Sequence, residues 1–147
     1  MKTVGTIVIK KIGEADSRGR VFSLESVNQI ITQFNERQIK RPNWPTLGEV
    51  KGEVNDPYSD RFVDLRKAGY EIKKMYIDGS DFKADVEFLE NPLGAVAKFA
   101  VDENSYKCIV RAYGTVNEDN SINVSEFITV DMTNKLKQNE PLERGQA

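Results

Sequence analysis

The clearest alternation of hydrophobic and polar residues lies between Gly69 and Leu89. Apolar residues at positions 82, 84, 86 and 88 are separated by Lys83, Asp85 and Glu87. A two-residue period is typical of a strand with one buried and one wet face. The Asp78–Asp81 segment, which contains a glycine, is suited to a turn. We therefore predict an antiparallel hairpin over Gly69–Leu89.

Helical spacing of apolar residues marks two further segments. The first follows Ser23, whose side chain suits an N-cap, and predicts a helix from about Leu24 to Gln38. The second begins at Asn91-Pro92, because proline is favoured at the first position of a helix. Runs rich in β-branched residues predict strands at Thr3–Ile12, Thr46–Val50, Lys107–Val116 and Ser121–Asp131.

This order of elements predicts an α+β fold with two main helices and a mostly antiparallel sheet, either open or closed as a barrel. We expect a single domain over residues 1–131. Residues 132–147 are polar and contain Pro141 and Gly145, so a loose C-terminal tail is expected.

The amino-acid composition limits the kinds of binding and catalytic site that we expect. The chain has 147 residues, a net charge of −2 and no basic stripe, so neither specific nucleic-acid binding nor membrane insertion is expected. The single cysteine, Cys108, alternates with Val110 and is expected to be buried in a sheet. Histidine is absent, which removes the usual general base and the commonest metal ligand.

Several motifs occur in an order that resembles the prohead (maturation) proteases of tailed phages, which share their fold with herpesvirus assemblin proteases. These motifs are Ser17–Phe22 before the first helix, Leu47-Gly48-Glu49-Val50, the hairpin turn at Asp78–Phe82, Asn91-Pro92-Leu93-Gly94, and Arg111–Asp119. The resemblance covers roughly Thr6 to Asp131. It implies a protease fold that acts in phage head assembly.

The same resemblance implies that the catalytic residues are missing. The family's histidine, which follows Leu-Gly-Glu-Leu, falls on Gly52. The family's serine nucleophile, just before Arg-Gly, falls on Ile109 or Val110. Arg111, which would help hold the surroundings of an oxyanion, is retained, and Asp131 matches an aspartate of the last strand. The resemblance therefore implies a protein that is not an enzyme.

Other residues offer weaker routes to chemistry. Cys108 could act only with a base or a cation beside it, and Ser125 only with a lysine across its hairpin. The Asp78–Asp81 segment lacks the ligand pattern of a calcium loop, and the aspartates between Asp56 and Asp64 lie in a segment broken by proline. We expect no catalytic residue, no metal and no cofactor.

The expected function is that of a capsid decoration or cement protein that binds the major capsid protein. It would form homo-oligomers or contact neighbouring copies, and would reside in the virion after assembly in the host cytoplasm. The alternatives are an active maturation protease with atypical catalytic residues and a peptide-binding or scaffold module of head assembly. The candidate interface residues are Trp44, Pro45, Tyr58, Phe62, Lys135, Leu136 and Leu142. For Trp44, a role as a core anchor is equally open.

Overall fold

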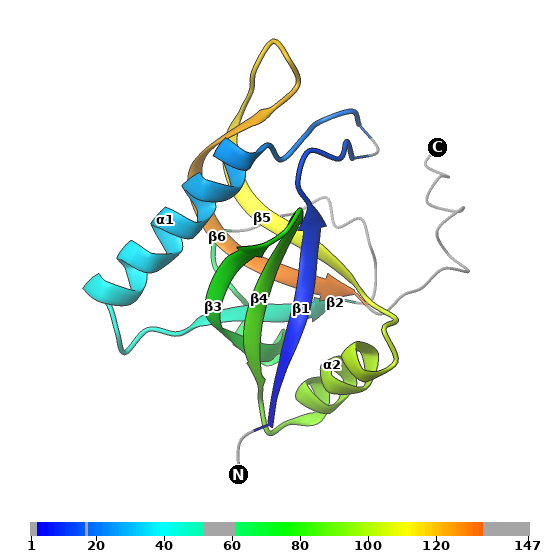
Figure 1. The fold of residues 1–147 in the computed structure, drawn as a ribbon. Coiled ribbons are helices and arrows are strands. Elements are labelled where there is room, and N and C mark those ends of the chain that lie inside the picture. Colours follow the sequence, from blue (N-terminus) through cyan, green and yellow to red (C-terminus); the bar gives the residue numbers. More distant parts are fainter. Residues whose placement is uncertain (1–2, 17, 52–60, 134–147) are drawn as a thin grey trace.

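The computed structural model describes residues 3–16, 18–51 and 61–133. The described elements follow one another as β1 (Thr3–Lys11), α1 (Leu24–Lys40), β2 (Thr46–Lys51), the short 3-10 helix η1 (Leu65–Lys67), β3 (Ala68–Asp78), β4 (Asp81–Phe88), α2 (Pro92–Asp102), β5 (Lys107–Val116) and β6 (Ile122–Thr133) (Figure 1). The predicted order of strands and helices is confirmed.

The strands form one strongly curved sheet of six strands in the order β1-β4-β3-β2-β6-β5. All neighbouring pairs are antiparallel except β2 and β6, which are parallel. The predicted α+β class is therefore confirmed, and the sheet takes the open form, since no ladder joins β1 to β5 in the described ranges. The Val8 N–H instead donates to the hydroxyl of Tyr106, 2.9 Å away.

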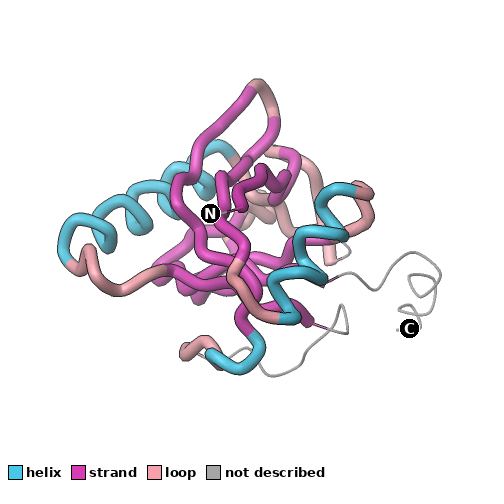
Figure 2. Tube along the Cα trace, turned by 90° about the horizontal axis from the view of Figure 1, so that it is seen from below, coloured by secondary structure: helices cyan, strands magenta, loops and turns pink. Residues whose placement is uncertain are grey.

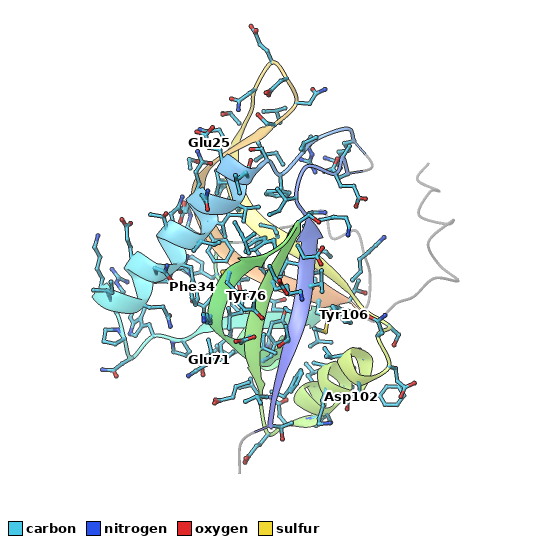
Figure 3. All side chains as sticks on the ribbon, in the orientation of Figure 1. Glu25, Phe34, Glu71, Tyr76, Asp102 and Tyr106 are labelled. Carbon is cyan, nitrogen blue, oxygen red and sulfur yellow. The ribbon has the colours of Figure 1, made fainter. Side chains whose placement is uncertain are left out.

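The core is built from the inward side chains of the curved sheet and the apolar faces of both helices. Its members include Ile7, Phe34, Val50, Tyr70, Phe82, Ala97, Cys108 and Met132. The two helices lie apart from each other, with strands between them in the view of Figure 2, and Phe34 points from α1 toward the strands (Figure 3). The predicted burial of Cys108 is confirmed.

Local signals account for the bounds of most elements. Ser23 caps α1 in a capping box with Ser26, and the two-residue turn between β3 and β4 places Gly79 at φ 65°. Helix α1 ends at Lys40, two residues beyond the expected end, because the Arg41 N–H still donates to the carbonyl of Arg37. Strand β6 continues to Thr133, two residues beyond its expected end at Asp131.

Helix α1 is held to the sheet by a polar stripe, defined here as Ser26, Gln29, Gln33 and Arg37. The stripe side chains bond backbone groups of β6 that β2 does not reach. The amide of Gln33, for example, accepts from the N–H of Phe127 at 2.7 Å and donates to the carbonyl of Val124 at 3.2 Å. A strand edge left unpaired is open to pairing with another chain. The helix therefore closes this edge with side chains instead of a strand.

Candidate functional site

Two of the three catalytic positions that the resemblance implies lie next to each other in the sheet. Ile109 on β5 is paired with Asp131 on β6. The third, Gly52, lies outside the described residues. Its predecessor Lys51 ends β2 and is paired with Thr133 of β6. The C-terminal ends of β2 and β6 and the first half of β5 therefore meet in one region, which is the candidate site.

The candidate site contains a buried charge cluster, defined as Glu49, Lys51, Arg111 and Asp131. Arg111 donates two hydrogen bonds to Asp131, from Nε to Oδ2 at 2.9 Å and from Nη2 to Oδ1 at 2.8 Å. The same Nη2 lies 3.1 Å from Oε2 of Glu49. The Lys51 ammonium lies 3.5 Å from Asp131. The side chains of Arg111 and Asp131 are only 3% and 1% exposed, so these charges are balanced within the protein.

The electrostatics of the cluster reflect burial and pairing together. Burial raises the pKa of Asp131, although Arg111 and Lys51 both act to lower it. Burial acts to lower the pKa of Arg111, but the carboxylates of Asp131 and Glu49 outweigh it and raise that pKa. A paired, hydrogen-bonded arrangement is what buried charges require.

The cluster also makes hydrogen bonds to the backbone of the residues that lead into η1. The guanidinium of Arg111 donates to the carbonyl of Phe62 at 3.1 Å, and Oε2 of Glu49 accepts from the N–H of Asp64 at 2.7 Å. The Glu49 N–H in turn donates to Asp131 at 3.1 Å. The cluster therefore ties β2, β5 and β6 to the residues that lead into η1, which is a structural role.

The described residues around the cluster offer little nucleophilic chemistry. Ile109 and Val110 carry hydrocarbon side chains. Burial raises the pKa of Cys108 to about 12, so its thiol stays protonated at neutral pH. Ser125 is exposed, and its hydroxyl donates to the carbonyl of Tyr113 at 3.0 Å. The Asp78–Asp81 segment forms the hairpin turn that we predicted. In the described ranges, no three acidic or cysteine side chains gather as metal ligands would.

The predicted interface residues do not form one surface in the described structure. Trp44 is 63% exposed just before β2, which makes the core-anchor alternative wrong, and Pro45 beside it is also exposed. Phe62 is 75% exposed near the buried charge cluster, toward the other end of β2. Tyr58, Lys135, Leu136 and Leu142 lie outside the described residues.

Sequence reasoning missed two features of this region. The sequence motif assigns Glu49 no contact, yet an acidic residue in an otherwise apolar strand signals a buried partner. The polar stripe of α1 is the second feature, because the apolar periodicity of a helix predicts only the face that packs on the core. Its spacing of three or four residues was visible in the sequence.

The sequence matches no protein-family model, and no curated protein sequence matches it. A solved structure does match the fold: that of the bacteriophage T4 capsid assembly protease, gp21, with a TM-score of 0.62 and 18% sequence identity. The match covers 88% of this chain and 80% of that protease chain. The chain therefore has a prohead protease-like fold, as the sequence motifs predicted. Within the described residues, neither helix is long and apolar enough to cross a membrane.

Proposed function

We propose that this chain is a phage structural protein that keeps the prohead-protease fold without the protease activity. In this proposal it decorates or cements the capsid by binding the major capsid protein, beside other copies of itself. It enters the particle in the host cytoplasm and stays with the mature virion. Its working surface is an interface and not a pocket.

One observation carries the proposal. On the fold of a capsid assembly protease, the strand position opposite Asp131 holds Ile109. Arg111 and Asp131 are engaged with each other and with Glu49, at distances of 2.8 to 3.1 Å. Hydrolysis of a peptide needs a nucleophile with a base to activate it. A cluster of mutually neutralised charges beside hydrocarbon side chains supports a structural use of the region.

The exposed aromatic residues support an interface. Trp44 and Phe62 present large apolar surfaces to solvent, at 63% and 75% exposure. Aromatic side chains are enriched among the residues that carry most of the energy of protein interfaces. A protein that binds a shell through such residues needs no catalytic pocket.

Quantitative mass spectrometry of purified mature virions tests the decoration role. We expect the chain at a copy number approaching that of the major capsid protein. Its absence from mature particles would exclude a cement role, because a cement protein must remain on the finished shell.

A cleavage assay tests the loss of activity. Purified chain is incubated with the phage's capsid and scaffold proteins, alongside Cys108→Ala and Ser125→Ala variants. We expect no fragments that depend on the chain. Fragments that vanish with either variant would establish a protease with atypical residues and overturn the proposal.

A further inference from the structure

An exposed aromatic residue is held in a fixed position at the end of α1. The N–H of Trp44 donates to the carbonyl of Arg41 at 3.0 Å. The guanidinium of Arg41 lies 4.8 Å from the centre of the Trp44 ring. This turn orders a ring that is nevertheless 63% exposed. An exposed tryptophan that already packs against a neighbouring side chain loses less conformational entropy on binding, which favours it as an anchor for a partner.

A shallow hollow of about 270 Å³ adjoins this turn, between the second half of α1 and β6. Its lining residues are Gln33, Glu36, Arg37, Lys40, Arg41, Glu126 and Phe127. Arg37 is turned into the sheet, where it donates to the carbonyls of Phe127 and Ile128. Arg41 lines the hollow and also stacks on Trp44, so the hollow and the ring form one continuous surface.

Lys40 and Arg41 give this surface positive charge, although the net charge of the whole chain is negative. Among the described residues, no carboxylate lies within ion-pair distance of Lys40 or Arg41, whereas Glu126 is paired with Arg61. Two cations without carboxylate partners thus line the hollow, and one of them, Arg41, also lies over an exposed tryptophan, on a protein whose net charge is −2. A partner that brings carboxylates to this place gains charge-assisted contacts.

We propose that Lys40, Arg41 and Trp44, with the adjoining hollow, form the docking surface for an acidic segment of the major capsid protein. The inference rests on the proposed function and names the partner chemistry at one place. Carboxylates of the segment pair with Lys40 and Arg41, while an apolar side chain packs on the Trp44 ring. Nucleic acid is the less favoured occupant, because two cations beside one tryptophan are fewer than the row of basic side chains with which proteins follow a phosphate backbone.

The test measures binding of the purified chain to assembled empty shells of the capsid protein by co-sedimentation at several salt concentrations. Lys40→Glu is the main variant, since Lys40 makes no contact that fixes Trp44. Arg41→Glu and Trp44→Ala complete the set. Lys98→Glu on α2 is the control, because it makes the same change of charge at a residue that does not line the hollow. Thermal denaturation checks that every variant is folded.

We expect Lys40→Glu and Trp44→Ala to weaken binding about tenfold or more, in line with losing a central contact of an interface. Lys98→Glu should bind like the wild type, and wild-type binding should weaken as salt rises. Trp44 is the sole tryptophan of the chain. Its fluorescence should therefore shift to shorter wavelength when the shell covers the ring.

The outcomes separate the two proposals. If shells bind the wild type and Lys40→Glu equally, or leave the Trp44 emission unchanged, the docking surface is wrong while decoration still stands. If shells do not bind the wild type, both proposals fail. If single-stranded DNA shifts the emission and shells do not, the occupant is nucleic acid and the inference is overturned.

Discussion

Replacement of Arg111 by methionine should destabilise the fold severely. Arg111 donates two hydrogen bonds to Asp131 and one to the carbonyl of Phe62, and it lies 3.1 Å from Glu49. Methionine fills a similar volume but leaves two buried carboxylates with their excess charge. Glu49 and Asp131 side chains are 8% and 1% exposed, so water cannot take the place of the guanidinium.

The expected loss of unfolding free energy depends on which partners the two carboxylates keep in the Arg111→Met variant. Asp131 keeps the N–H of Glu49 at 3.1 Å and the ammonium of Lys51 at 3.5 Å. Glu49 keeps the N–H of Asp64 at 2.7 Å. Removal of one partner from a buried ion pair costs about 3–5 kcal/mol. Since a domain is stable by roughly 5–15 kcal/mol, Arg111→Met should lose a large part of its unfolding free energy.

Urea denaturation followed by far-ultraviolet circular dichroism measures this loss. The double variant Arg111→Met/Asp131→Asn should lose less than the sum of the single variants, with a coupling of about 1–3 kcal/mol, because the unpaired charge is also removed. Arg66→Met is the control, since Arg66 is 89% exposed and its loss should leave the unfolding free energy unchanged. A loss below about 1 kcal/mol for Arg111→Met, or strict additivity, would refute the role assigned to the cluster.

Three further predictions concern other features. Gln33→Ala should lower the unfolding free energy by about 1–3 kcal/mol, because two backbone groups of β6 lose their partner. Asn35→Ala on the exposed side of α1 serves as its control, and equal losses for the two variants would contradict the edge-covering role. Gly48→Ala should destabilise by about 1–3 kcal/mol or more, since its Cβ would lie 2.2 Å from the ring of the buried Tyr70; an unchanged urea midpoint would count against that packing. Cys108 should react with iodoacetamide only on unfolding, because burial raises the pKa of its thiol from 9.0 to about 12. Above about pH 9 the unfolded chain loses the thiol proton, whereas the folded chain keeps it. The free energy of unfolding should therefore fall by about 1.4 kcal/mol per pH unit, and the Cys108→Val variant should not show this fall. Rapid labelling of the folded protein would disprove the burial.

The elements of the fold could be predicted because their causes are local. The alternation through β4 places every second side chain on one face, and Ser23 caps the helix that follows it. The turn at Gly79 closes the hairpin within a few residues. In each case the residues that decide the structure are close together in the chain. Even the likeness of fold could be inferred, since it depended on the order of such motifs.

The candidate site was only partly predictable. Asp131 and Arg111 were singled out, and the structure brings them into contact at 2.8 Å. That Glu49 belongs to the same cluster could not be predicted, because its partner Arg111 lies far along the chain. Of the expected interface residues, Trp44 and Phe62 are exposed, yet they lie toward different ends of β2.

The sequence by itself determined the strands, the helices, their order and the absence of histidine chemistry, since periodicity, capping and composition are properties of short segments or of the whole chain. Only the tertiary structure decided that the sheet stays open, that the polar stripe of α1 covers β6, and that Glu49 and Lys51 join Arg111 and Asp131. These arrangements join residues far apart in the chain. They exist because buried charges and strand edges must find partners once the core has formed.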